Sequence, residues 1–406
     1  MTAASEAAKP AGAPFSIIAA LGVVQMLMWG STFYLLAVLA PAIVAETGWS
    51  FRWVIGGVTI GLLVAGLISP RVGRIIDRRG GRPVLAFSSA ITAASFVVLA
   101  LSTSLPVYLL AWIMMGVGMG TGLYDAVFAA LGRLYGQEAR SAITNLTLFG
   151  GFGSTVCWPL SAYLVATWDW RTACLVYAAI HFAVALPIHL LVFPATPPRK
   201  NADTPEQPGA VTTATPLSRQ HAIAFWLLAA VQTLAQAIGA IIIVHLLVFL
   251  QARGLTLATA VTLGTLFGPA QVAARVIERV FGHHYHPIWT MIVAAGLMTV
   301  GLALLLVDLP IVAGAIVIYG AGYGVTWIAR GTLPLAIFGP ERYAVLMGKL
   351  ALPSLIAPAL SPFAGALLIE HWGPLATVAV LTAVAAINVV LVLGLFRFSH
   401  ATKPSS

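Results

Sequence analysis

Asp125 is the only acidic residue that lies well inside one of the long apolar runs of this sequence. An ionisable side chain is costly in such surroundings, so it marks a functional position. A carboxylate there can carry a proton, or it can pair with the arginines of a neighbouring loop. Asp125 lies toward the end of its run that leads to basic loops. We therefore expect it to pair with loop arginines.

Sulfur-containing side chains lie in the same apolar runs. Met115 and Met119 are four residues apart and share a helix face, which would suit a soft metal ion. Cys157 and Cys174 are candidate ligands of a trivalent arsenical. Methionine is also an adaptable packing residue, and most buried cysteines are inert. We expect packing roles, with no metal site.

The sequence contains no nucleotide-binding loop, catalytic triad or zinc signature. His181, His189 and His245 lie singly in apolar runs, where a histidine usually hydrogen-bonds to a neighbouring helix. We therefore expect no enzyme activity and no cofactor.

The elements that position these residues are membrane-spanning helices. Of the 406 residues, 60% are hydrophobic and only 8% are charged, and the mean hydropathy is +0.97. A helix needs roughly 20 apolar residues to cross a bilayer. The apolar runs predict an all-α membrane protein with twelve spans, near residues 16–42, 52–69, 83–102, 106–132, 142–166, 172–193, 222–250, 259–281, 287–306, 311–330, 344–369 and 374–396.

The net charge of +9 reflects orientation in a membrane rather than binding of nucleic acid. All lysines and arginines except Arg52, Arg171 and Arg253 fall on one predicted side of the twelve spans. Because cytoplasmic loops carry an excess of Lys and Arg, both termini are predicted to be cytoplasmic. We expect a multi-pass protein of a bacterial inner membrane.

The chain is predicted to contain a duplicated six-helix unit. The segment Arg74 to Arg78 recurs as Arg275 to Arg279, each time between the second and third span of its half. The predicted units are an N-terminal bundle over 1–193, a cytoplasmic linker over 194–220 and a C-terminal bundle over 221–406. Parallel repeats of this kind place a substrate site at their interface, near the middle of the membrane.

The loop after the second span contains the most specific motif. Gly73, Asp77, Arg78, Gly80 and Arg82 match the loop signature Gly, three residues, Asp-Arg, one residue, Gly, one residue, basic. This pattern resembles that of the major facilitator superfamily, which implies a secondary transporter with alternating access. The resemblance implies that these five residues, together with Asp125, form a conformational switch between the halves.

Within that superfamily, the segment Gly48 to Ser50 before the second span is similar to the bacterial monocarboxylate-porter-like branch. The segment Tyr135 to Arg140 also resembles that branch. This implies transport of a small organic acid. The alternative is efflux of drugs or toxic compounds, soft metals and arsenicals included. An acid carrier should have a cation in its cavity, whereas a drug exporter needs only an aromatic, apolar one.

The resemblance also implies that spans one, four, seven and ten line the cavity. Polar or aromatic side chains that share a helix face on these spans are the candidate substrate-binding residues: Gln25, Trp29, Thr32, Met119, Gln232, Gln236, Tyr319, Tyr323 and Trp327. Trp29, Met119, Gln236 and Tyr323 should meet at similar depth.

The expected partners are a small-molecule solute, protons and the lipid bilayer. Apart from Asp125 and the histidines, the spans offer almost no titratable group. Proton symport or antiport should therefore be weak or run through Asp125; otherwise the carrier is a uniporter or moves a proton with the solute. We expect a monomer.

Overall fold

The computed structural model describes residues 13–196, 218–307 and 311–399. Within these ranges all regular structure is helical. Eleven stretches are long and apolar enough to cross a membrane. One of them, Leu105–Thr167, has 63 residues and is long enough for two crossings. The described residues thus account for twelve crossings, as the sequence predicts.

The first six crossings contain short irregular segments between their helices. Their elements are α1 (Phe15–Met28), η1 (Trp29–Phe33) and α2 (Leu36–Thr47); α3 (Phe51–Arg79); α4 (Gly81–Ala100); α5 (Leu105–Gly122) and α6 (Tyr124–Tyr135); η2 (Gly136–Glu138), α7 (Ala139–Gly150) and α8 (Gly153–Thr167); and α9 (Trp170–Ile180), η3 (His181–Ala185) and η4 (Ile188–Val192).

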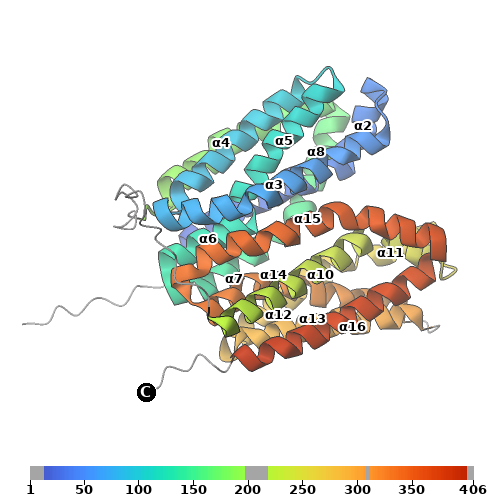
Figure 1. Cartoon of the computed structure of the whole chain (residues 1–406). Helices are drawn as coiled ribbons and strands as arrows, with labels where there is room; N and C mark the ends of the chain where they lie inside the picture. The colour runs from blue at the N-terminus through green and yellow to red at the C-terminus, as the bar shows by residue number, and fades with distance from the viewer. Residues whose placement is uncertain (1–12, 197–217, 308–310, 400–406) are drawn as a thin grey trace, which may run out of the picture.

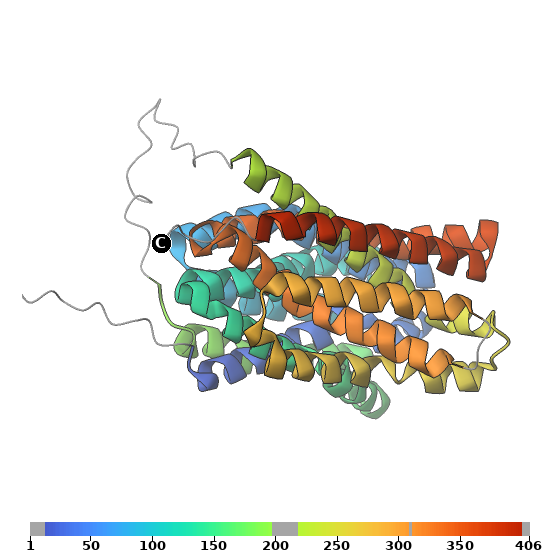
Figure 2. The same ribbon diagram turned by 90° about the horizontal axis from the view of Figure 1, so that it is seen from below.

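The last six crossings are more regular. Their elements are α10 (Arg219–Gln251); α11 (Leu257–Gly264), α12 (Phe267–Phe281) and η5 (Gly282–His284); α13 (Pro287–Leu306); α14 (Val312–Phe338); α15 (Pro340–Trp372); and α16 (Pro374–Ser399). Figure 2 shows the helices side by side along one common direction.

The helices form two groups that face each other. In Figure 1, α2, α3, α4, α5 and α8 lie together on one side, and α10 to α13 lie with α16 on the other. Along the boundary between the two groups, α3 runs beside α15. The predicted linker falls largely on residues 197–217, outside the described residues. The division into 1–193 and 221–406 therefore stays a proposal.

Glycines allow the two groups to touch at the end where α3 meets α4. A Cβ on Gly73 would lie 2.5 Å from the carbonyl oxygen of Ala344, and a Cβ on Gly348 would lie 2.4 Å from that of Ser69. Only glycine permits such an approach between α3 and α15. Gly80 ends α3 with a φ of +82°, a conformation that also favours glycine. Close helix packing therefore requires glycine at position 73, and the turn after α3 favours glycine at position 80.

Two irregular segments position residues of the site. The π-helical segment η1 interrupts the first span at Trp29, and such segments often occur at functional sites. In the fourth span, Leu123 is extended and separates α5 from α6. Asp125 therefore lies in the first turn of α6, where the helix dipole favours a carboxylate.

Candidate functional site

A cavity of about 750 Å³ lies between the two groups of helices. Side chains of the first span, α3, α10, α14 and α15 form its walls, and nearly all of them are apolar or aromatic. Phe51 and Arg52 line it at the start of α3, whereas α3 and α15 are in contact near Gly73. The cavity therefore opens toward the end opposite to the Asp77 loop. Its size is in the range of small-molecule pockets.

Four of the nine predicted binding residues line this cavity: Trp29, Gln236, Tyr323 and Trp327. We call the first six and the last six crossings the two halves. The rings of Trp29, in the first half, and Trp327, in the second, have centroids 5.2 Å apart. Tyr323 packs edge-on against Trp327, with a centroid distance of 6.1 Å, and its hydroxyl lies 3.5 Å from Oε1 of Gln236. The structure thus brings together three predicted faces, those of spans one, seven and ten.

The other five predicted residues do not line the cavity, because their side chains are used elsewhere. Gln25 donates from Nε2 to the carbonyl of Gly122 at 2.6 Å. Thr32 donates to the carbonyl of Met28 on its own helix. Gln232 donates to the carbonyl of Arg330 at 3.3 Å.

Met119 is fully buried beside Gly61 of α3, so span four packs against span two and does not face the cavity. Tyr319 is buried and stacks on Phe267 of α12.

Most of the lining residues that were not predicted lie on spans two and eleven. Arg52 and Thr59 of α3 and Ser354 of α15 are the polar ones among them. On the first span, Phe33 and Tyr34 extend the aromatic wall and were not predicted either. The wall residues of α3 and α15 are mostly ordinary aliphatic side chains. Nothing in their sequence pattern separates a cavity face from a face that contacts lipid.

Below the cavity, Asp125 of α6 pairs with Arg330 of α14. The two carboxylate oxygens accept from Nε and Nη2 of Arg330 at 2.9 and 2.7 Å. Arg330 is only 1% exposed. The same Nη2 donates to Ser354, which lines the cavity. This bidentate pair therefore joins the halves directly beneath the cavity floor.

The expectation that Asp125 pairs with loop arginines is wrong. Both of its oxygens are bonded to Arg330, which lies 205 residues away in the sequence. Arg78 is exposed and Arg82 is half-buried. Arg133 of α6 contacts the end of α3, where it donates to the carbonyl of Asp77 at 3.1 Å.

Arg275 is a second buried arginine between the halves, only 3% exposed. It donates to the carbonyls of Thr147 at 2.8 Å and Gly324 at 3.0 Å, and lies 3.4 Å from Oε1 of Gln271. Thr147 belongs to α7 in the opposite half. The sequence pattern had assigned Arg275 to a loop repeat, but its side chain reaches the middle of α14. No ion-pair partner of Arg275 is found within the described part of the chain.

Two further arginines close the loop-side end of the interface. Arg140, where α7 begins, donates to the carbonyls of Gly282 and Tyr285, both at 2.6 Å. Arg279 of α12 donates to Asn145 of α7. Together with Asp125 and Arg330, these contacts hold the halves closed on the side of the Asp77 loop.

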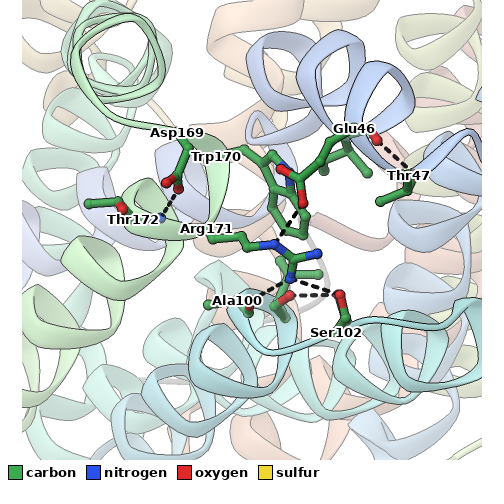
Figure 3. Close-up of polar contacts among 10 residues, drawn as sticks. Glu46, Thr47, Ala100, Ser102, Asp169, Trp170, Arg171 and Thr172 are labelled. Carbon is green, nitrogen blue, oxygen red and sulfur yellow. Dashed lines mark hydrogen bonds and ion pairs between the residues drawn. The ribbon is translucent and has the colours of Figure 1, made fainter.

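At the opposite end, a polar cluster ties the N-terminal helices together. Figure 3 shows Arg171 between Glu46 and the turn after α4. It bonds to Glu46 at 2.9 Å and to the carbonyls of Ala100 and Ser102 at 2.6 and 2.8 Å. Trp170 donates to the second oxygen of Glu46 at 2.7 Å. The cluster fixes α2, α9 and α4 to each other where the cavity opens, without lining it.

Known proteins resemble this chain in sequence and in fold. A sequence model of the Major Facilitator Superfamily matches residues 19–286. An uncharacterised 38 kDa protein in the 23S RNA operon of Thermoproteus tenax is 27% identical over 308 residues, which are 75% of each chain.

Among solved structures, the human organic anion transporter MFSD10 (TETRAN) superposes with a TM-score of 0.73 at 16% identity. FucP, in its outward conformation, superposes with a TM-score of 0.71 at 13% identity. Both similarities cover 93% of this chain and 98% of the other. At these identities the likeness is one of fold.

Proposed function

The chain belongs to the Major Facilitator Superfamily, a family of transporters, and from this premise we propose that it moves a small organic acid by alternating access. The acid would have an apolar body, because the cavity walls are aromatic and aliphatic. The resemblance of the segments Gly48–Ser50 and Tyr135–Arg140 to the monocarboxylate-porter-like branch supports the same substrate class.

The observation that carries this proposal is a set of buried nitrogen donors without partners. Nε1 of Trp29 and Nε2 of Gln236 belong to cavity-lining residues, and Nη1 of Arg330 lies beneath the floor. Among the described residues none of these three atoms has a hydrogen-bond partner. Leaving a buried donor unsatisfied costs about 1–3 kcal/mol. A carboxylate would supply the acceptors, and its bonds to charged donors are the stronger ones.

Arg275 would provide a second cation as the transporter turns. Its bond to Thr147 crosses between the halves, so parting of the halves on the loop side would release that donor. When a buried guanidinium is bonded only to neutral oxygens, its positive charge is poorly compensated. An entering carboxylate would take the place of the lost carbonyl. Arg275 is therefore proposed as the anion site of the state that opens on the loop side.

The proposed orientation places the Asp77 loop, the linker and both termini in the cytoplasm of a bacterial cell, with the protein in the inner membrane. The distribution of lysine and arginine supports this. In that orientation the cavity faces outward, and the bonds of Asp125 and Arg140 close the inner side. The bundles 1–193 and 221–406 would rock about the cavity in a protein that acts as a monomer.

Efflux of a neutral apolar compound is the second candidate, and the aromatic wall of Trp29, Phe33, Tyr34, Tyr323 and Trp327 favours it. A cationic drug fits less well. Arg52 is the only charged residue among those described around the cavity, and no carboxylate lines it.

The test uses purified protein in proteoliposomes preloaded with unlabelled acid. Counterflow of radiolabelled monocarboxylates with short apolar chains would support the proposal. Each acid is compared with its uncharged amide, which has the same shape. If the amide were transported as fast as the acid, or if only neutral dyes were transported, the result would favour efflux of neutral compounds.

A further inference from the structure

Span six contains two fully buried histidines that the mechanism above does not use. His181 begins η3 and His189 lies in η4, and their exposed fractions are 0% and 1%. His181 Nε2 lies 2.8 Å from the hydroxyl of Ser31, and His189 Nδ1 lies 2.8 Å from the hydroxyl of Ser89. Each ring is therefore held by one serine of a neighbouring helix.

The second nitrogen of each ring is unsatisfied. His181 Nδ1 and His189 Nε2 are buried and have no hydrogen-bond partner among the residues described. In the tautomer whose proton lies on the serine side, this nitrogen is an acceptor. It can then bind a proton without loss of the serine bond. Both histidines thus have the geometry of a proton acceptor inside an apolar bundle.

Two more buried hydroxyls lie on α4, close to Ser89 in the sequence. Thr92 lies one turn from Ser89 and one turn before Phe96, which stacks on His181 at a centroid distance of 5.7 Å. The hydroxyls of Ser88 and Thr92 are buried and also lack partners within the described ranges. They point at Gly122 and Gly118 of α5, where a larger residue would leave them no room. We call His181, His189, Ser88, Ser89 and Thr92 the polar seam.

Proton conduction along the polar seam would require buried waters that bridge its members. A buried water needs two to four polar partners, and unsatisfied buried groups usually obtain theirs from such waters. The histidines of the seam belong to span six and its three hydroxyls to α4, where Ser89 makes the contact between the two spans. His189 is close to the end of span six on the loop side, and His181 is about two turns deeper.

The deeper end of the seam reaches the wall of the cavity. Ser31 lies in η1, between Trp29 and Phe33, which both line the cavity. Gly30 packs against Cys157 so closely that a Cβ would lie 2.2 Å from its sulfur. A change of charge on His181 would therefore act on a tightly fitted segment.

Few other titratable groups face the two histidines. Tyr177 and Cys157 contribute neutral groups from α9 and α8, and Tyr177 stacks on Phe96 at 5.6 Å on the side of His181. From η1 and α4 the rings are contacted by Ser31, Ser89 and Phe96, none of which carries a charge. Asp125 has both oxygens on Arg330, so it cannot accept a proton without weakening the pair that joins the halves.

We propose that the polar seam carries the protons that accompany transport, with His181 and His189 as the carriers between the loop side and the Trp29 wall. This inference rests on the proposed transport function. It assigns proton coupling to the N-terminal half, away from the pair of Asp125 and Arg330.

The test combines two readouts on purified protein in proteoliposomes. The first is acid-driven proton flux, followed with an internal pH-sensitive dye, beside counterflow of the same acid. His181→Gln and His189→Gln keep a hydrogen-bonding group but cannot hold a proton. The matched control is His245→Gln, since His245 is half-buried in the C-terminal half, where its ring bonds to the carbonyl of Pro362. We expect both seam variants to lose proton flux and to keep counterflow, while the control keeps both.

The second readout needs no substrate. Amide hydrogen exchange over Trp29–Phe33, corrected for intrinsic rates, should change as the pH is lowered in the wild type and in His245→Gln, but not in His181→Gln. If the wild type moves no acid, the proposed function fails while this readout still decides the role of His181. Unchanged proton flux in both seam variants, or the same pH response of Trp29–Phe33 with and without His181, would overturn the proposal.

Discussion

The guanidinium of Arg330 forms two hydrogen bonds with the carboxylate of Asp125, and this pair spans the boundary between the two halves. Ser354 connects it to the cavity. A buried ion pair of this kind is held only while the halves remain in contact on the loop side, so we propose that it acts as the gate on that side.

Asp125→Asn and Arg330→Gln should each impair transport strongly. Removing one partner of a buried pair costs about 3–5 kcal/mol, because the other charge stays buried. We expect a fall in melting temperature and slow counterflow, with partial recovery in the exchanged variant Asp125→Arg with Arg330→Asp. If Asp125→Asn instead abolished pH-driven transport and preserved exchange, Asp125 would be the proton carrier and the polar seam would not.

Gly73→Ala should shift the halves apart at the loop-side end. The new methyl group would meet the carbonyl of Ala344, and overpacking of this kind costs about 1–3 kcal/mol. Spin labels on α3 and α15 should report a longer distance on that side. Gly296→Ala is the control, since a Cβ there meets no atom within 4 Å. Equal distances in the two variants would show that the contact does not set the conformation.

Trp29→Ala, Gln236→Ala and Tyr323→Ala should each weaken substrate binding, because all three residues line the cavity. A loss of about tenfold, equivalent to about 1.4 kcal/mol, is expected for each. Tyr319→Phe serves as the control, since its ring is buried against Phe267. Titration calorimetry on purified protein measures the affinities. Wild-type affinity in all three variants would place the pocket elsewhere.

Arg275→Gln should lower the affinity for acids on the loop side more than on the opposite side. Glutamine keeps a neutral hydrogen-bond donor at this position but has no charge to compensate a carboxylate. Inside-out and right-side-out vesicles separate the two affinities. Arg279→Gln is the comparison, because its partner is Asn145 at the exposed end of the interface. An equal loss on both sides would remove the state-dependent role of Arg275.

Cysteine labelling can establish the orientation. Cys157 and Cys174 are both buried, so they should give little background. Arg78→Cys should react with an impermeant maleimide only in inside-out vesicles, and Arg253→Cys only in right-side-out vesicles. The opposite pattern would invert the topology and turn the cavity toward the cytoplasm.

The crossings could be predicted closely because a bilayer demands about 20 apolar residues for each. Their ends could not. The second span was expected to end at residue 69, but α3 continues to Arg79 as an amphipathic helix through basic residues that face water. The polar and aromatic faces of spans one, seven and ten can be predicted from helical spacing. Met119 also has that spacing, but packing against Gly61 determines where it points.

Contacts between residues far apart in the chain could not be predicted from the sequence pattern. Nothing in one sequence connects Asp125 to Arg330, and the repeat of the Arg74 segment places Arg275 only between two spans. Aliphatic wall residues such as Leu355 resemble lipid-facing ones, so the contribution of spans two and eleven could only come from the packing of α3 against α15.

Counterflow in proteoliposomes tests the central claim most directly. Purified protein is offered a short-chain monocarboxylate and its amide, with the Trp29→Ala and Arg275→Gln variants in parallel. The account predicts saturable counterflow of the acid, little movement of the amide and a loss of acid affinity in both variants. Counterflow of the amide that equals that of the acid, with neither variant altered, would contradict it.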